Sequence, residues 1–167
     1  MEKLFSFPNP VNESSARLVA AGVVILGAAF VGTGNPWMLV ALTYGFVARV
    51  LSGPTLSPLG RLATQVITPR LNVRHRFVPG PPKRFAQGIG AAFTLVASVL
   101  MLTDATSLAR IVIAILVVAA FLESVFAICL GCIVFGRLMR LGVVPQRVCE
   151  ECNSFTSREL ATRTHPA

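Results

Sequence analysis

A long apolar stretch in the second half of the chain constrains the fold most strongly. It runs from Leu108 to Met139 and contains few charged side chains, one of which is Glu123. A helix needs about 20 residues to cross the hydrocarbon core of a bilayer, so this stretch can cross the core and continue beyond it. We therefore predict an integral membrane protein whose last span is one continuous helix.

The composition of the whole chain agrees with this prediction. Of its 167 residues, 54% are hydrophobic and 13% are charged, whereas about 25% of the residues in a soluble domain are charged. The net charge is +8, and no acidic residue lies between Glu13 and Asp104. In so apolar a chain, a basic surplus indicates cytoplasmic segments that follow the positive-inside rule, and we expect no binding of nucleic acid.

The hydropathy pattern predicts an all-α membrane protein with four transmembrane helices and a short amphipathic interfacial helix. The second span is short and carries Arg49, so a tilted, re-entrant or thinned arrangement is open there. In the third span, small side chains recur every fourth residue and allow close helix packing. The predicted spans are residues 15–31, 37–51, 85–102 and 110–136, and the interfacial helix covers residues 58–68.

The distribution of basic residues predicts the topology. Four spans place the N-terminal arm, the middle loop and the C-terminal tail on one side of the membrane, and these are the basic segments. We therefore expect a transmembrane domain over residues 1–142, a tail over residues 143–167 and cytoplasmic N- and C-termini. The lipid bilayer is the expected partner, and a homo-oligomer is left open.

All four cysteines lie in two Cys-x-x-Cys pairs. Cys129 and Cys132 belong to the last span, where a helix would place them on one face and close enough for a slightly strained disulfide. Cys149 and Cys152 belong to the tail. The paired arrangement favours a thiol–disulfide relay in which these four residues are catalytic and exchange with a thioredoxin-like or sulfur-handling protein.

Two other interpretations of the cysteines stay open. The spacing of the pairs fits a zinc site with Cys129, Cys132, Cys149 and Cys152 as ligands, so zinc is the alternative cofactor. In the other interpretation the cysteines are packing residues of a non-catalytic membrane subunit or scaffold.

Two charged residues within the spans are further candidates. On a continuous helix, Glu123 would lie about 120° from Cys129 and opposite Cys132, so we expect a buried acid that does not serve both thiols. Arg49 should lie near the depth of Cys129, where it could stabilise a thiolate. Pairing with Glu123 and snorkelling to the headgroups are the alternatives for Arg49.

A series of short motifs runs along most of the chain. The motifs are Asn12-Glu13 with Arg17, Arg49, Ser57-Pro58, Lys83-Arg84-Phe85-Ala86, Glu123 and Cys129-x-Gly131-Cys132. Their order resembles that of a family of small bacterial integral membrane proteins defined by a domain of unknown function (four-three-nine-five). The resemblance covers about residues 10–142 and implies a four-helix protein of the bacterial cytoplasmic membrane without an assigned activity.

Overall fold

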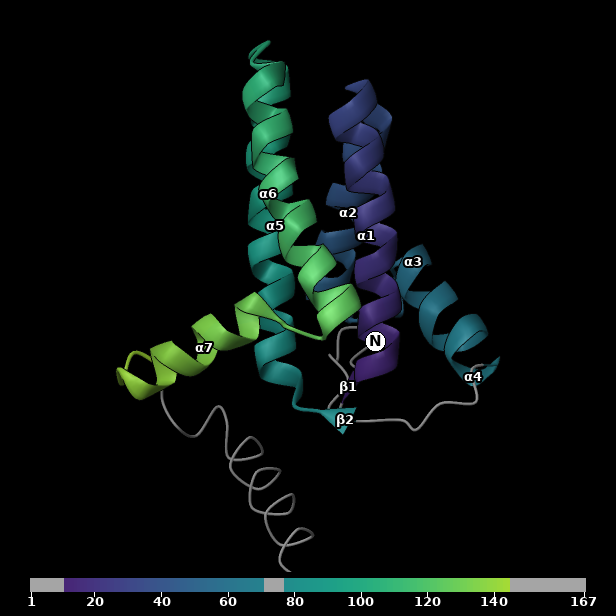
Figure 1. Cartoon of the computed structure of the whole chain (residues 1–167), viewed down its shortest axis with the longest axis vertical. Helices are drawn as coiled ribbons and strands as arrows, with labels where there is room; N and C mark the ends of the chain where they lie inside the picture. The colour runs from purple at the N-terminus through teal and green to yellow at the C-terminus, as the bar shows by residue number, and fades with distance from the viewer. Residues whose placement is uncertain (1–10, 71–76, 145–167) are drawn as a thin grey trace, which may run out of the picture.

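Four long helices lie side by side in the computed structural model, which describes residues 11–70 and 77–144 (Figure 1). Within these ranges α1 packs mainly against α6, α2 mainly against α5, and α5 also packs against α6. Consecutive helices of the pairs α1–α2 and α5–α6 are joined by short turns and are antiparallel. The four helices are α1 (Glu13–Thr33), α2 (Pro36–Ser52), α5 (Gly80–Leu102) and α6 (Thr106–Phe126).

Asparagine side chains cap the N-termini of α1 and α2. The Oδ1 atoms of Asn12 and Asn35 accept hydrogen bonds from the backbone N–H groups of Ser14 and Trp37, each at 3.0 Å. These bonds satisfy N–H groups that have no partner inside the helix. Between the two helices, Gly34 adopts a left-handed conformation with φ 69°, which glycine reaches at no steric cost.

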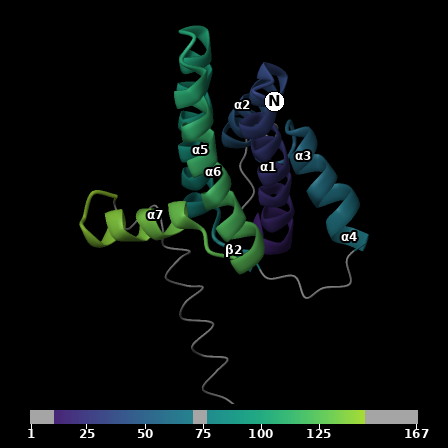
Figure 2. The ribbon, with the colours of Figure 1, turned by 45° about the horizontal axis from the view of Figure 1, so that its top comes forward.

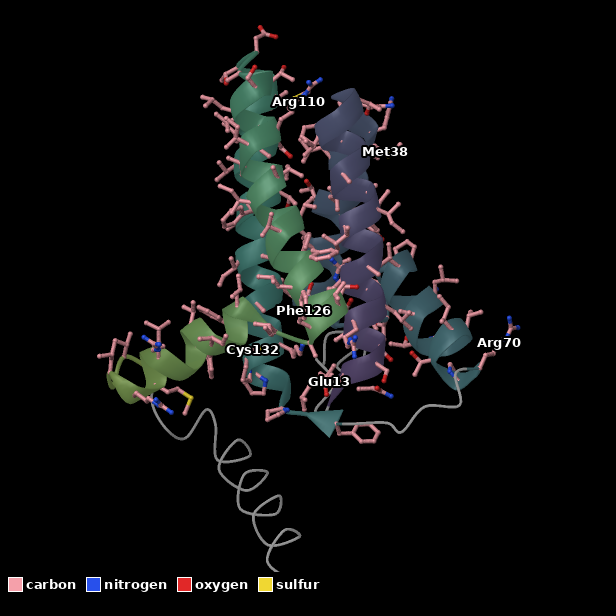
Figure 3. The ribbon with its side chains drawn as sticks, in the orientation of Figure 1. Glu13, Met38, Arg70, Arg110, Phe126 and Cys132 are labelled. Atoms are coloured by element: carbon pink, nitrogen blue, oxygen red, sulfur yellow. The ribbon has the colours of Figure 1, made fainter. Side chains whose placement is uncertain are left out.

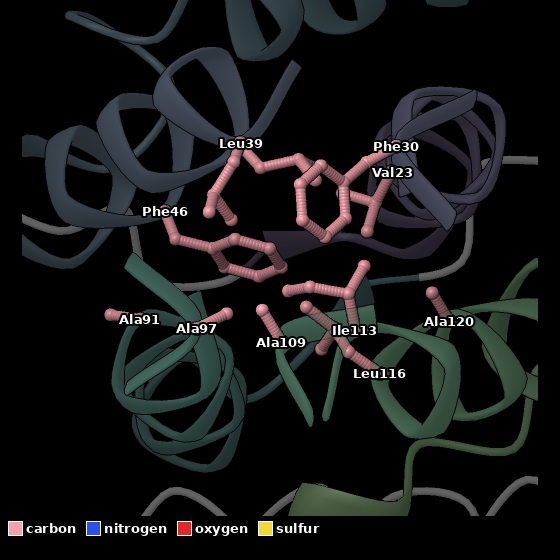
Figure 4. Close-up of a cluster of buried hydrophobic side chains, with 11 residues drawn as sticks. Val23, Phe30, Leu39, Phe46, Ala91, Ala97, Ala109, Ile113, Leu116 and Ala120 are labelled. Atoms are coloured by element: carbon pink, nitrogen blue, oxygen red, sulfur yellow. The ribbon is translucent and has the colours of Figure 1, made fainter. Parts of the chain in front are cut away.

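The apolar core lies between the four long helices (Figure 4). Phe30 and Ile113 are fully buried at its centre, and small alanines on α5 and α6 let the helices approach. The buried members are Val23, Phe30, Leu39, Leu42, Phe46, Ala91, Ala97, Ala109, Ile113, Leu116 and Ala120.

The small residues expected along the third span do permit close packing. A Cβ atom on Gly90 would lie 2.2 Å from the Phe46 ring, so α2 can approach α5 this closely only because residue 90 is glycine. One turn further on, Thr94 is fully buried. Ser98 then lies 3.3 Å from the Thr43 hydroxyl across the same interface.

The helical segment after α2 consists of α3 (Pro58–Arg61), the π-helix η2 (Leu62–Ile67) and α4 (Thr68–Arg70). It lies beside α1, where the Thr68 and Ser15 hydroxyls are 2.8 Å apart. The predicted helix over residues 58–68 is therefore present, and it continues to Arg70. Its Leu62 and Val66 side chains are exposed.

A short pair of strands was not foreseen from the sequence. The strand β1 (Val11–Asn12) pairs antiparallel with β2 (Phe77–Val78), with Val11 opposite Val78. This pairing joins the start of α1 to the start of α5, so both helices begin at the same end of the bundle.

The predicted continuous span over residues 110–136 is wrong. The helix α6 ends at Phe126, Ala127 turns the backbone with φ 58°, and α7 (Leu130–Arg140) follows as a separate helix. Both ribbon views show α7 running sideways from the end of the bundle (Figures 1 and 2). We call the end of the bundle that carries α7 the dithiol end.

A contact from α1 explains where α6 ends. The Arg17 guanidinium donates hydrogen bonds to the backbone carbonyls of Ser124 and Val125, at 2.9 and 3.0 Å. These carbonyls belong to the last turn of α6, where a continuing helix would bind them itself. Arg17 therefore replaces the helical hydrogen bonds that are lost when the chain turns away.

Three of the described helices, α1, α5 and α6, are long and apolar enough to cross a membrane. The apolar helix α2 has 17 residues, which gives about 25 Å against a hydrocarbon core of about 30 Å. Many large apolar side chains on the outside of the bundle are exposed, as is usual for side chains that face lipid. The protein is thus a helical membrane protein.

Candidate functional site

The dithiol of Cys129 and Cys132 lies at the N-terminus of α7. Cys129 is the N-cap residue of this helix and is buried, whereas Cys132 is the third helical residue and is half-buried. Both are free thiols. Figure 3 shows Cys132 at the dithiol end, at the opposite end of the molecule from Arg110. Thiols at helix N-termini are more acidic than usual because the unpaired N–H groups and the helix dipole favour negative charge.

Gly131 fixes this dithiol against α5. A Cβ atom at this position would lie 2.7 Å from Cα and 2.6 Å from Cβ of Ala86. Real Cβ contacts are longer, so any other residue here would push the start of α7 away from α5. The Cys-x-Gly-Cys pattern therefore combines two thiols with the one residue that allows the helices to touch.

An ion pair between Lys83 and Glu123 lies beside the dithiol. Lys83 Nζ lies 2.5 Å from Glu123 Oε1, and their side chains are 10% and 17% exposed. The pair joins the first turn of α5 to the last turns of α6. Both charges act on both thiols, so the break after α6 brings Glu123 near a pair that it would face away from on a continuous helix.

The two thiols are chemically unequal. A hydrogen bond from the Cys132 thiol, helped by the positive charge of Lys83, lowers the pKa of the Cys129 thiol. Burial and the negative charge of Glu123 oppose this change without cancelling it. The same hydrogen bond, together with burial, raises the pKa of Cys132. Since the thiolate is the nucleophilic form of cysteine, Cys129 is the thiol of the pair that is more readily converted to a nucleophile.

Arg49 is buried in the bundle and does not snorkel. It is 5% exposed, and its Nε donates to Gln87 Oε1 at 2.8 Å. Its NH1 group lies 3.3 Å from the Ser57 hydroxyl, and its guanidinium stacks 4.5 Å from the centre of the Phe46 ring. Its positive charge interacts with Glu123. The cation that acts on the thiols is Lys83.

A cavity of about 230 Å³ connects these groups. Its walls come from α1, α2, α5, α6 and α7 and are mostly apolar. Four polar or reactive residues interrupt this apolar lining, namely Arg49, Gln87, Glu123 and Cys129.

The structure thus brings together four of the residues singled out in the sequence: Cys129, Cys132, Glu123 and Arg49. Cys149 and Cys152 lie outside the described residues, so the second pair and the four-cysteine zinc site stay predictions. In residues 11–70 and 77–144 no group of three or more His, Cys, Asp or Glu side chains is placed to hold a metal.

Sequence reasoning missed Lys83 and Gln87 as site residues. The sequence offered a weak signal for Lys83, because the Lys83-Arg84-Phe85-Ala86 motif opens an apolar helix. A cation in that position usually snorkels to the headgroups, and only the burial of its ion pair shows otherwise. Gln87 carried no signal, since it is a single polar residue one turn further along the same helix.

The fold and the site together define a helical membrane protein with a free dithiol at the start of a short helix beside the bundle. The chain belongs to the family described as a domain of unknown function (DUF4395), whose model matches residues 11–140. No curated protein and no solved structure matches the chain.

Proposed function

We propose that the protein is a membrane thiol–disulfide exchange protein in which Cys129 and Cys132 alternate between dithiol and disulfide. The observation that carries this proposal is the position of the pair, with Cys129 as N-cap and Cys132 as the third residue of α7. Residues three apart in a helix lie about 5–6 Å apart at Cβ. A disulfide needs about 3.5–4.5 Å between its Cβ atoms, so the pair can close when the extended backbone at Cys129 moves these atoms about 1–2 Å nearer.

The order of the exchange steps follows from the different acidities of the two thiols. The Cys129 thiolate attacks a disulfide of the partner, which forms a mixed disulfide and releases one partner thiolate. Cys132 then loses its proton to a thiolate or to solvent and attacks the Cys129 sulfur. The products are the Cys129–Cys132 disulfide and a partner dithiol, so two electrons pass to the partner.

The partner we propose is a thioredoxin-like or sulfur-handling protein, and the tail pair Cys149–Cys152 is a relay between it and the buried dithiol. The dithiol end is also the basic end. Arg17, Lys83 and Arg140 belong to elements that start or finish there, whereas the opposite end carries Asp104 and Arg110. By the positive-inside rule, four spans with both termini in the cytoplasm of a bacterial cell fit this distribution.

Trapping of mixed disulfides tests the exchange. Cys132→Ser removes the resolving thiol, so a partner should remain covalently attached to Cys129 and appear as a reductant-sensitive adduct. Cys129→Ser is the matched control and should trap nothing at this pair. If both variants give the same adducts, or if neither gives any, Cys129 is not the attacking thiol and the proposal fails.

A further inference from the structure

The cavity beside Cys129 has a composition that the exchange reaction does not require. Cys129 is 9% exposed, and in addition to its exchange partner it meets a cavity of about 230 Å³ whose wall it helps to form. The cavity is therefore a place where a small molecule can meet the sulfur from inside the bundle.

One side of the cavity is built from residues that are also exposed on the outside of the bundle. Ile115 on α6 is 55% exposed, and Leu130 and Val134 on α7 are 42% and 44% exposed. All three line the cavity. In a membrane protein, exposed apolar side chains on a spanning helix such as α6 face lipid. The exposed apolar side chains of α7 continue this surface at the end of the bundle, so a ligand dissolved in the bilayer can enter between α6 and α7.

The inner wall supplies groups that recognise carbonyl oxygens. The Arg49 guanidinium is a pure hydrogen-bond donor, and the Gln87 amide, which accepts from Arg49 at 2.8 Å, also carries an NH₂ donor. Around them, Phe46 and Phe93 provide aromatic surface. Two of the five N–H groups of the Arg49 guanidinium are used by Gln87 and Ser57. A lipid tail would match the apolar walls but has no oxygen to accept from the others or from the Gln87 NH₂ group.

We propose that this cavity binds the ring of an isoprenoid quinone and that the quinone oxidises the Cys129–Cys132 dithiol. This inference rests on the proposed thiol–disulfide function and names its membrane-soluble electron acceptor. An engineered cavity of about 150 Å³ holds benzene, so a cavity of about 230 Å³ has room for a substituted ring. The isoprenoid tail passes between α6 and α7 into the lipid.

The reaction balances in electrons and protons. Cys129 and Cys132 lose two protons and two electrons as their sulfurs form one disulfide bond. The quinone takes up two electrons and two protons and becomes the quinol. Thiol–disulfide exchange is reversible, so a partner dithiol can also reduce the Cys129–Cys132 disulfide by the reverse of the exchange described above. Combined with that reverse exchange, this reaction carries electrons from thiols into the quinone pool.

The test uses the reduced full-length protein in lipid nanodiscs and a short-chain ubiquinone analogue with a fully substituted ring. Quinol formation is followed by ultraviolet absorbance, and the dithiol by alkylation and mass spectrometry. We expect one quinol for each Cys129–Cys132 disulfide, and no quinol from Cys129→Ser. A covalent quinone–sulfur adduct in place of the disulfide would contradict the proposal.

A substitution that fills the cavity tests quinone binding without changing either thiol. Ala119→Leu places a larger side chain in the cavity wall, whereas Ala114→Leu makes the same change at a half-buried position of α6 that does not line the cavity. We expect Ala119→Leu to slow the quinone reaction about tenfold or more, equal to a loss of about 1.4 kcal/mol. Oxidation by diamide, a water-soluble thiol oxidant, should stay unchanged in both variants.

The outcomes separate the two proposals. If diamide forms the disulfide but the quinone does not, or if Ala119→Leu and Ala114→Leu behave alike with the quinone, the quinone site is refuted and the exchange function stands. If neither oxidant links Cys129 to Cys132, the exchange function fails as well.

Discussion

At the scale of single residues, two charges beside the dithiol add to the effects that the Cys132 hydrogen bond and burial have on the pKa of the Cys129 thiol. Lys83 favours the Cys129 thiolate and Glu123 disfavours it, and the two are paired with each other. This arrangement lets the protein hold a cation near a buried sulfur without leaving that cation unpaired in an apolar environment.

Replacing either charge should shift the pH at which Cys129 reacts, in opposite directions. Lys83→Met removes an effect that lowers the pKa of Cys129, so its alkylation should need a higher pH. Glu123→Gln removes an effect that raises this pKa, so alkylation should begin at a lower pH. The measurement is the alkylation rate of the Cys129 peptide against pH. The control, Arg84→Met, removes a neighbouring cation whose Nε donates to the Val50 carbonyl at 3.0 Å, and its profile should lie close to that of the wild type.

Gly131 should be the glycine of α7 that tolerates substitution least. Gly131→Ala drives a Cβ atom into Ala86, and such overpacking costs about 1–3 kcal/mol. A Cβ atom on Gly136 meets nothing within 4 Å, so Gly136→Ala should be neutral or should stabilise the helix by up to about 1 kcal/mol. Thermal unfolding in detergent compares the two. Equal melting temperatures would show that α7 does not rest on α5 at Gly131.

At the scale of elements, the break after α6 decides what the dithiol can do. On one continuous helix the thiols would lie on a flank and Glu123 would face away from Cys132. The break instead makes Cys129 an N-cap and brings Lys83, Glu123 and both sulfurs together.

The direction in which one substitution changes the stability distinguishes a broken helix from a continuous one. Ala127 has φ 58°, a conformation that costs an L-residue about 1–2 kcal/mol and costs glycine almost nothing. Ala127→Gly should therefore raise the melting temperature. Ala114→Gly, in the middle of α6, should lower stability by about 1 kcal/mol. A similar loss at both positions would mean that the helix runs on through residue 127.

The long helices could be predicted from the sequence, whereas the break could not. Apolar length alone indicated the long helices, whereas the caps supplied by Asn12 and Asn35 emerged only in the structure. Ala127 and its apolar neighbours carry no breaking signal.

The contact that ends α6 comes from Arg17, which is 107 residues away from Ser124 in the sequence. The dithiol was recognisable as a Cys-x-x-Cys pair. Its ion-pair neighbour was not, because Lys83 and Glu123 meet only in three dimensions.

At the scale of the whole molecule, one end of the bundle is basic and carries the dithiol, and the other holds the turn with Asp104. We propose four spans, and labelling of single cysteines checks them. In a variant whose four native cysteines are serine, Asp104→Cys should react with a membrane-impermeant thiol reagent added outside intact cells. Arg140→Cys should react only after the cells are opened. Labelling of both from outside would require a different number of spans.

The redox state of Cys129 and Cys132 in native membranes tests the proposed thiol–disulfide exchange most directly. Membranes are treated with reductant or oxidant, free thiols are alkylated, and the peptides are analysed by mass spectrometry. We predict two alkylated thiols after reduction, and a reversible Cys129–Cys132 disulfide after oxidation. A pair that stays alkylatable under both treatments and never forms a disulfide would contradict this prediction.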